Sequence, residues 1–544
     1  MNKDFRICGK CKAEISRDYL DRNYSICPEC GNYLRMHASQ RIESIADEDS
    51  FKLWSSHEIF TNPLKDDSYV KVCEEAEDKH SLNDAIIDGE ITIDGTRVAI
   101  GVMDTRFMMA SMGHIVGERV TRLFETATKK KLPVILFCCS GGARMQEGMI
   151  SLMQMEKTAA AVKRHGDAGN LYISVLTNPT MGGVTASFAT LADVVLAEKG
   201  AMIGFAGARV IEQNTGRKLP EGFQTAEFQK EHGFVDMVVN RENMKDIITY
   251  LVKIHAKPAK LTANLPARQA NKSERKTVNR RMIERTPWER VQIARSLTRP
   301  TSKDYIDALF ENFVEMCGDR ISSDDHAVIG GVATFHGCPI TVVGHQKGKE
   351  SVEAALYRNW GMPSPQGYRK VMRLAKQAEK FKRPVIFFID TIGAACGQEA
   401  EEDGQGIAIA NVLHEMSTLK TPVLSIVIGE GGSGGALALG IANEVWMLEN
   451  SIYSVITPES YASILWKDNT KCEQAANKMK LEADSLYDLK VIDKIIYEEE
   501  PVTKGNMGNI CKILDKEIID FLSKYLKKST TGIVKERYQK FRQY

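Results

Sequence analysis

The sequence repeats itself at an offset of about 250 residues, and this repetition restricts the folds that the chain can adopt. Three kinds of segment occur twice and in the same order: Lys131–Phe137 with Lys382–Phe388, Tyr172–Leu176 with Val423–Val427, and Met181–Gly183 with Gly432–Gly435. A repeat of this length is typical of two copies of one domain, because solenoid repeats span only about 20 to 50 residues. The chain is therefore expected to contain two homologous domains.

Each copy alternates apolar segments with helical ones. The apolar segments are short and bounded by proline, which is typical of buried strands. Buried strands that alternate with helices predict an α/β fold with largely parallel sheets. We expect the two domains at 37–252 and 286–544. The stretch 253–285 holds ten Lys or Arg and two acids, so it is interpreted as a solvated linker, with nucleic-acid binding as the alternative.

Four cysteines near the N-terminus have the spacing of a metal site. Cys8 and Cys11 form one C-x2-C pair, Cys27 and Cys30 form a second, and fifteen residues separate the pairs. Four thiolates suit tetrahedral Zn²⁺, and a closed set of four is typical of a structural site. We therefore expect a zinc ribbon over residues 1–36 that serves as a staple or a lid.

The charge balance of the whole chain indicates no particular partner. With 72 basic and 71 acidic side chains the formal net charge is +1, which gives no global attraction to nucleic acid or membranes. No apolar run reaches the roughly 18–20 residues of a membrane span, and the N-terminus has no signal-peptide hydrophobic region. The other eight of the twelve cysteines are scattered, so we expect a reducing, cytoplasmic compartment.

Glycine-rich loops follow the strand candidates in both copies. They span 140–147 and 179–184 in the first copy, and 390–395 and 429–435 in the second. Glycine lets a ligand approach the main chain, and the N-terminus of a following helix offers unpaired N–H donors. Two facing loops of this kind can form an oxyanion hole that stabilises an enolate or a similar anion. The alternative is that these glycines serve only the packing of helices on strands.

No other pattern in the sequence identifies a catalytic group. The loops lack the G-x4-G-K-[ST] of a P-loop and the G-x-G-x-x-G of a dinucleotide site, and no serine lies in a G-x-S-x-G elbow. His114, His345 and His414 show no triad arrangement and are interpreted as packing or surface residues. Asp390 ends a buried strand and is expected to cap the next helix. The lack of an evident base suits chemistry in which the substrate or cofactor supplies one.

At these motifs the chain resembles the carboxyltransferase component of bacterial acetyl-CoA carboxylase, with the β and α subunits fused in that order. The first half carries the four-cysteine ribbon and β-like motifs at 140–148, 151–155, 173–177, 179–184, 203–207 and 209–213. The second half carries α-like motifs at 344–348, 358–363, 367–370, 429–438 and 462–466. The resemblance covers nearly all of the chain outside the linker.

The resemblance implies two crotonase-like domains of the ClpP/crotonase superfamily in tandem, with an active site between them. The first would bind acetyl-CoA and the second carboxybiotin on a separate biotin carboxyl carrier protein, and the product would be malonyl-CoA, in the first committed step of fatty acid synthesis. Freed biotin would remove a proton from the acetyl methyl group, and the enolate would attack CO2. Biotin carboxylase would be a further partner, and a fused chain would form a homodimer.

The resemblance also implies which residues serve each substrate. The residues expected to hold the thioester enolate oxygen are the catalytic Gly182 and Gly183, with Gly142 and Ala143 facing them. The residues expected to hold the biotin ureido oxygen are the catalytic Gly434 and Gly435, with Gly393 and Ala394. The alignment of the two copies leaves the choice between Gly434 and Gly435 open by one residue.

Two segments depart from the family pattern. The β-like segment Phe-Met-Gly-Gly-Ser-Met-Gly has Met109 and Ala110 in place of the two glycines. The α-like segment Asp-Thr-Pro-Gly-Ala-Tyr-Pro-Gly has Ile392, Ala395 and Cys396 in place of the proline, the tyrosine and the second proline. These changes are expected to alter the approach of a ligand to the main chain or the shape of the biotin-side loop.

Two other functions fit parts of the sequence. The nearest is a carboxyltransferase or decarboxylase of propionyl-CoA or methylmalonyl-CoA, because selection of one methyl group is worth only about 1–3 kcal/mol. The second is a zinc-ribbon regulator that binds nucleic acid. The neighbourhood of the ribbon is mildly basic, although Glu14, Asp18 and Asp21 offset its four arginines: Arg17, Arg22, Arg35 and Arg41. Salt-sensitive binding without turnover would mark the regulator.

Overall fold

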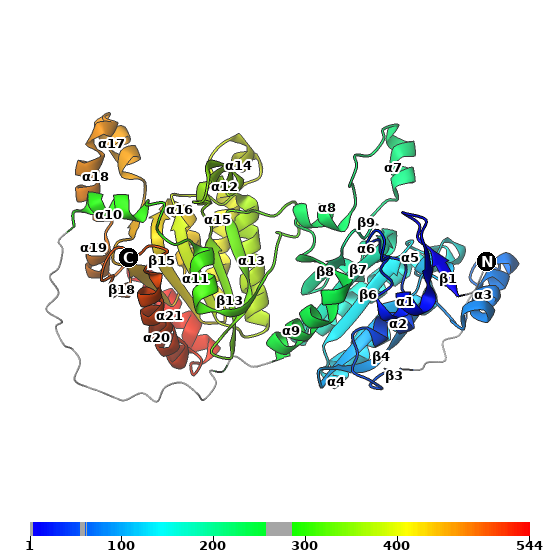
Figure 1. Cartoon of the computed structure of the whole chain (residues 1–544). Helices are drawn as coiled ribbons and strands as arrows, with labels where there is room; N and C mark the ends of the chain where they lie inside the picture. Colours follow the sequence, from blue (N-terminus) through cyan, green and yellow to red (C-terminus); the bar gives the residue numbers. More distant parts are fainter. Residues whose placement is uncertain (1–3, 55–59, 61, 257–259, 261–284) are drawn as a thin grey trace. The chain divides into compact units, whose positions relative to one another are not determined.

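The computed structural model describes residues 4–54, 60, 62–256, 260 and 285–544, and it contains two compact units, Met1–His255 and Ala256–Tyr544 (Figure 1). We call them the N-terminal unit and the C-terminal unit. Residues 253–256 of the predicted linker end the helix α9 (Met244–Ala256), and most of the remainder lies outside the described residues. The domain boundaries given above therefore stay predictions.

The N-terminal unit is built on an eight-stranded sheet with the order β10-β8-β7-β6-β5-β4-β3, and β9 lies beside β7. The pairs β3–β4 and β4–β5 are antiparallel and the other pairs are parallel. The strands are β3 (Lys52–Leu53), β4 (Ile86–Ile93), β5 (Thr96–Met103), β6 (Val134–Ser140), β7 (Tyr172–Met181), β8 (Val194–Glu198), β9 (Ile203–Gly204) and β10 (Met237–Val239). Besides α9, the helices are α2 (Ala38–Glu43), α3 (Asp67–His80), α4 (His114–Lys130), α5 (Met149–Asp167), α6 (Gly182–Thr185), α7 (Ala208–Thr215) and α8 (Ala226–Glu231).

The C-terminal unit has a sheet of the same topology, with the order β11-β12-β13-β14-β15-β16-β18 and β17 beside β15. The strands are β11 (Glu311–Glu315), β12 (Val328–Phe335), β13 (Cys338–His345), β14 (Val385–Thr391), β15 (Val423–Gly432), β16 (Glu444–Leu448), β17 (Ile452–Ser454) and β18 (Lys494–Ile496). The helices are α10 (Pro287–Ala294), α11 (Ser302–Leu309), α12 (Val352–Tyr357), α13 (Pro365–Lys380), α14 (Gln398–Glu402), α15 (Gln405–Thr418), α16 (Ser433–Gly440), α17 (Pro458–Trp466), α18 (Cys472–Met479), α19 (Ala483–Asp488), α20 (Met507–Tyr525) and α21 (Thr530–Arg542).

The two units match in detail, which confirms the predicted α/β class and the duplication. Each sheet has a hairpin with two central residues of positive φ, Asp94-Gly95 between β4 and β5 and His336-Gly337 between β12 and β13. Such turns match the right-handed twist of the strands that they join. The helix before the central strand packs on the helix after it in both units, α4 on α5 and α13 on α15.

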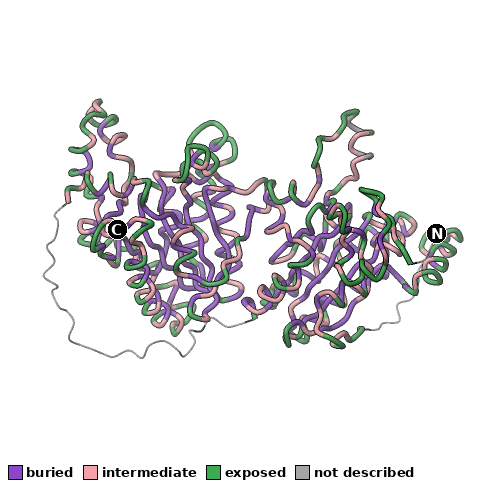
Figure 2. Tube along the Cα trace, viewed as in Figure 1, coloured by how far each residue is buried: buried purple, intermediate pink, exposed green. Residues whose placement is uncertain are grey.

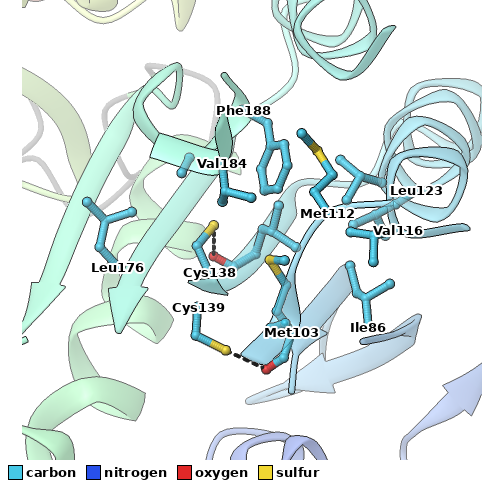
Figure 3. Packing of buried hydrophobic residues seen from close by; sticks show 14 of the residues in the cluster. Ile86, Met103, Met112, Val116, Leu123, Cys138, Cys139, Leu176, Val184 and Phe188 are labelled. Atoms are coloured by element: carbon cyan, nitrogen blue, oxygen red, sulfur yellow. Dashed lines mark hydrogen bonds between the residues drawn. The ribbon is translucent and has the colours of Figure 1, made fainter. Parts of the chain in front are cut away.

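The central strands of both units are buried, and the helices and loops around them combine buried, intermediate and exposed residues (Figure 2). In the N-terminal unit the core reaches the loops that follow β6 and β7. Met112, Val184 and Phe188 lie close to Cys138 there (Figure 3), and all four are fully buried. This packing fixes α6, the short helix that begins with the predicted catalytic glycines.

Residues 4–36 form a small hairpin domain with its own core. It contains β1 (Phe5–Ile7), β2 (Glu14–Ser16) and α1 (Arg17–Arg22). Buried Ile15, Leu20 and Leu34 pack with two of the cysteines. Within the described part of the chain, none of the helices combines the length and apolar character that a membrane span requires.

Candidate active site

The four cysteines predicted to bind zinc lie together in the hairpin domain. Their sulfur atoms all lie within 4.8 Å of one another, with 3.7 Å between Cys8 and Cys30 and 3.6 Å between Cys11 and Cys27. Hydrogen bonds from the amides of Cys11 and Lys10 help to lower the pKa of the Cys8 thiol to about 6, whereas the neighbouring cysteines outweigh a backbone hydrogen bond and raise the pKa of Cys11 to about 12. Four converging thiolates are the donor set of a closed zinc site. The cluster can therefore hold a metal ion.

A buried ion cluster fixes this ribbon to the sheet. Arg241 donates to the Glu198 carboxylate at 2.7 and 2.8 Å, and Arg41 donates to the same carboxylate at 2.6 Å. The third nitrogen of Arg241 donates to three carbonyls of the ribbon, those of Tyr24, Ser25 and Leu34. Burial raises the pKa of Glu198, but the charges of Arg41 and Arg241 outweigh it and lower the pKa to about 2. The ribbon is thus attached at the end of β8.

The loop after β6 rests on a turn of uncommon backbone geometry. Met108, Met109 and Ala110 have φ of 43°, 54° and 53°, although none is glycine. The carbonyl of Met109 accepts the amide of Gly141 at 2.8 Å, and the carbonyl of Ala110 accepts the hydroxyl of Ser140 at 2.7 Å. The two positions that depart from the family glycines therefore keep a left-handed backbone, at a cost of roughly 1 kcal/mol or more each.

The same turn continues into a bridge that orients the amide of Ala143. Met112 pairs with Ala143 in parallel: its amide donates to the Gly142 carbonyl at 2.8 Å, and its carbonyl accepts the Arg144 amide at 2.9 Å. Because successive amides of an extended segment point to opposite sides, the amide of Ala143 points away from Met112. The Ala143 amide can therefore donate a hydrogen bond to an acceptor on the side of the loop that faces away from Met112.

Arg144 anchors the loop from inside the unit. Its side chain is 1% exposed and makes a bidentate pair with Asp84 at 2.6 and 2.9 Å. It also donates to the Ser111 carbonyl at 2.9 Å and to Glu147 at 3.3 Å, and Glu147 accepts the Tyr69 hydroxyl at 2.7 Å. Burial lowers the pKa of Arg144, but the paired Asp84 outweighs it and raises the pKa. The sequence gives no sign that this arginine is buried.

The second loop of the N-terminal unit closes against the first. Gly182 has a φ of 61°, and a Cβ there would lie 3.0 Å from the Cα of Gly142, which restricts the position to glycine. The Gly182 amide donates to the Phe205 carbonyl at 2.9 Å, whereas Gly183 is the second residue of α6 and its amide has no acceptor within that helix. A Cβ at Gly183 would lie 3.5 Å from that of Ala143. Two amides without secondary-structure partners thus lie on adjacent loops.

The C-terminal unit repeats the first of these loops. The hydroxyl of Thr391 accepts the Gly393 amide at 3.1 Å and donates to the Gly393 carbonyl at 2.6 Å. Ser140 makes the same two bonds with Gly142, at 2.9 and 3.2 Å. The hydroxyl at the end of the strand therefore shapes the loop in both units.

The strand register decides which glycine of the C-terminal unit corresponds to Gly183. The last register pair before the loops is Ser140 with Thr180 in one unit and Thr391 with Gly431 in the other. Three residues further along, Gly434 takes the position of Gly183. Ser433 takes the position of Gly182, and both have positive φ, at 54° and 61°.

Gly434 and Gly435 differ in what surrounds them. A Cβ at Gly434 would meet nothing within 4 Å, whereas one at Gly435 would collide with the amide of Ala394. Gly435 therefore permits the close approach of the two loops, and Gly434 faces open space as the second residue of α16. The catalytic roles of both glycines stay predictions.

An ion cluster lies beside the loops of the C-terminal unit. Lys347 Nζ lies 2.8 Å from Asp390 and 2.8 Å from Glu430, and Asp390 accepts the Glu430 amide at 3.0 Å. Burial raises the pKa of Asp390, but Lys347 and Lys349 outweigh it and lower the pKa to about 2. The prediction that Asp390 caps the next helix is wrong, because α14 begins after Gly397 without a side-chain cap.

The fold of the chain matches solved carboxyltransferases. A transcarboxylase 12S structure with methylmalonyl-CoA bound has a TM-score of 0.71 and 18% identity, and the match covers 94% of this chain and 93% of that chain. A single-chain, multi-domain long-chain acyl-CoA carboxylase has a TM-score of 0.67 and 17% identity, over 89% of this chain and 46% of that chain. The chain therefore has the crotonase-like carboxyltransferase fold.

Sequence similarity narrows this class to one family. The family described as acetyl co-enzyme A carboxylase carboxyltransferase-like matches residues 236–544. The acetyl-coenzyme A carboxylase carboxyl transferase subunits beta/alpha of Natranaerobius thermophilus are 48% identical, over 98% of this chain and 90% of the relative. Those of Clostridium tetani are 46% identical over 98% and 92%. This chain belongs to the acetyl-CoA carboxylase carboxyltransferase family, with beta-like and alpha-like halves in one polypeptide.

Proposed function

We propose that this chain transfers the carboxyl group of carboxybiotin to acetyl-CoA and forms malonyl-CoA. The observation that carries the proposal is the duplicated pair of loops, each with a main-chain amide left without a helix partner. The names of the relatives support the choice of acetyl-CoA over propionyl-CoA and methylmalonyl-CoA.

In the N-terminal unit, the amides of Gly183 and Ala143 serve the thioester oxygen. Negative charge develops on this oxygen when the acetyl methyl group loses a proton, and preorganised amides stabilise such charge without reorganisation. Support comes from the rigidity of both loops: Gly182 closes on Gly142, and Arg144 holds the first loop from the interior. The remaining predicted residues, Gly182 and Gly142, shape the backbone, because their amides already donate to the Phe205 carbonyl and the Ser140 hydroxyl.

In the C-terminal unit, the amides of Gly434 and Ala394 serve the ureido oxygen of biotin. Biotin on its carrier supplies the carboxyl group and, once CO2 has left, a ureido nitrogen that accepts the methyl proton. Support comes from the register, which aligns Gly434 with Gly183, and from the open space in front of Gly434. Gly435 and Gly393 then have a structural role in bringing the two loops together.

The partners proposed for this reaction follow from the family. They are acetyl-CoA and malonyl-CoA, a biotin carboxyl carrier protein, biotin carboxylase, and a second copy of the chain in a homodimer. We propose that the four cysteines hold one Zn²⁺ with a structural role, because four sulfur atoms within 4.8 Å of one another can supply all the ligands of a tetrahedral site.

The direct experiment runs the reaction in reverse. Purified, zinc-loaded chain is given malonyl-CoA with free biotin as acceptor, and the loss of malonyl-CoA and the appearance of acetyl-CoA are followed. We expect turnover with malonyl-CoA and slower turnover with methylmalonyl-CoA. A folded, zinc-loaded protein without turnover of either would refute the enzyme function, and a preference for methylmalonyl-CoA would correct the substrate.

A further inference from the structure

Three arginines of the zinc ribbon form no ion pair within the part of the chain that the structure describes. Arg17 and Arg35 are exposed, Arg6 is half-buried, and none of the three forms an ion pair with a described residue. We call Arg6, Arg17 and Arg35 the ribbon arginines. Arg6 is in β1 and donates to the carbonyl of Arg35 at 3.1 Å, and Arg17 follows β2, the strand paired with β1. The three cationic side chains therefore belong to one small part of the ribbon.

Several acids near the ribbon arginines have other partners, whereas Asp4 and Glu14 of the same hairpin form no ion pair among the described residues. Asp18 pairs with Arg22 at 2.9 Å, and Asp104 makes a bidentate pair with Arg106. Asp21 acts electrostatically on Arg6, and it also accepts a hydrogen bond from Gln40. The positive charge of this part of the ribbon is thus only partly compensated within the described residues.

We call the loop after β6, residues 140–147, the acyl-side loop. Met109 connects it to the ribbon arginines. Arg35 Nη1 lies 3.5 Å from the sulfur of Met109, and the Met109 carbonyl accepts the amide of Gly141. Gly141 directly precedes Gly142 and Ala143, which shape and form the proposed site for the thioester oxygen. A ligand with its thioester at Ala143 can therefore extend past Met109 toward the ribbon.

We propose that the ribbon arginines bind the phosphate groups at the nucleotide end of the acyl-CoA. The proposal rests on the proposed function, because it requires the thioester to lie at the acyl-side loop. Guanidinium groups bind phosphate through two parallel hydrogen bonds, which makes unpaired arginines suited to a diphosphate or a phosphomonoester. The ribbon thereby contributes to substrate binding and is more than a staple of the fold.

The ribbon arginines also lie near the cysteine cluster, which suggests a competing role. Zinc with four thiolates carries a formal charge of about −2, and arginines can balance that charge. Zinc content therefore has to be measured for every variant. A variant that keeps its zinc and loses affinity for CoA separates the two roles.

The test measures binding of CoA and of pantetheine to the full zinc-loaded chain by calorimetry. Pantetheine lacks the nucleotide phosphates, so it reports only the rest of the site. We expect Arg35→Gln and Arg6→Gln each to weaken CoA binding about tenfold or more at unchanged pantetheine affinity, since each removes a charge-assisted hydrogen bond to phosphate. Arg22→Gln, which removes an exposed arginine already paired with Asp18, is the matched control and should leave CoA affinity unchanged.

Three results would overturn the proposal. One is equal CoA affinity in all variants that keep their zinc. Another is a parallel loss of pantetheine affinity, which would indicate a structural effect on the loop. The last is weaker binding of a single-stranded RNA with unchanged CoA affinity, which would assign the arginines to nucleic acid. Because binding is measured without turnover, an inactive wild type that still binds CoA through these arginines contradicts only the proposed reaction.

Discussion

At the scale of single residues, the buried Arg144 has the most direct effect on the proposed site. It is a charged side chain in the interior that is paired in a bidentate way with Asp84 and holds the loop that carries Ala143. A lysine keeps the charge but cannot form the two parallel bonds of a guanidinium. We expect Arg144→Lys to lower the free energy of unfolding by about 2 kcal/mol or more, because a buried pair that loses its geometry leaves charge uncompensated. Urea unfolding measures this loss.

The same variant should change catalysis in a specific way. If Arg144 positions the loop, kcat for malonyl-CoA falls while KM stays close to that of the wild type, since the oxyanion forms only along the reaction. Arg97→Lys is the control, because Arg97 is an exposed partner of Glu90 and should tolerate the change. An Arg144→Lys enzyme with wild-type kcat would show that the loop needs no such support.

Residue-scale features were the hardest to predict from the sequence. The pattern of the loops was visible, but nothing in it indicates that Arg144 is buried or that Lys347 reaches Asp390, because both contacts join distant segments. The cap role predicted for Asp390 was wrong for the same reason. The left-handed backbone at Met109 and Ala110 could not be predicted from the sequence either, since these residue types disfavour a positive φ.

At the scale of secondary-structure elements, the zinc ribbon depends on Glu198 at the end of β8. The folded pKa of Glu198 is about 2 and its ordinary value is near 4.5. A carboxyl with a lowered pKa stabilises the folded state above its unfolded pKa, and this contribution disappears as the pH falls from about 4.5 to about 2. We expect the amides of 24–34 to exchange hydrogen faster over this pH range, as measured by mass spectrometry.

The Glu198→Gln variant separates this effect from loss of metal. Acid also protonates the cysteine thiolates, but it does so in both proteins. We expect the variant to exchange faster at neutral pH already and to lack the part of the acid response that Glu198 causes. Identical acid profiles in the two proteins would contradict the attachment that Arg41, Arg241 and Glu198 are inferred to provide.

The start of α16 offers the cleanest substitution in the C-terminal unit. Gly434 is the second residue of that helix, and a side chain there enters open space, so Gly434→Val should fold. It should reduce turnover about a hundredfold or more by filling the space in front of the amide, in line with the loss of one oxyanion donor. Gly508→Val is the matched control for Gly434→Val. Gly508 is the second residue of α20, and a Cβ there would also meet nothing within 4 Å. Equal turnover in both variants would remove Gly434 from the site.

At the scale of the whole molecule, the duplication explains why so much of the fold was predictable. Buried parallel strands such as β6 and β14 are continuous apolar runs, and such runs remain recognisable in both copies. The glycine loops follow because the strand ends and helix starts recur at the same places. A single sequence does not reveal the register of the strands. The pairing of Thr391 with Gly431 and the open space at Gly434 together select Gly434 over Gly435 as the counterpart of Gly183.

We propose above all that main-chain amides stabilise an anion in the acyl-binding unit. The most direct measurement compares malonyl-CoA turnover with free biotin for the wild type and for Gly183→Val, with CoA binding and unfolding measured on both. A Cβ at Gly183 meets the sulfur of Met155 at 3.2 Å, which is the flexible end of a side chain, so the fold can adjust. We expect a loss of turnover of about a hundredfold or more at retained folding and CoA binding. Wild-type turnover in Gly183→Val would contradict the proposal.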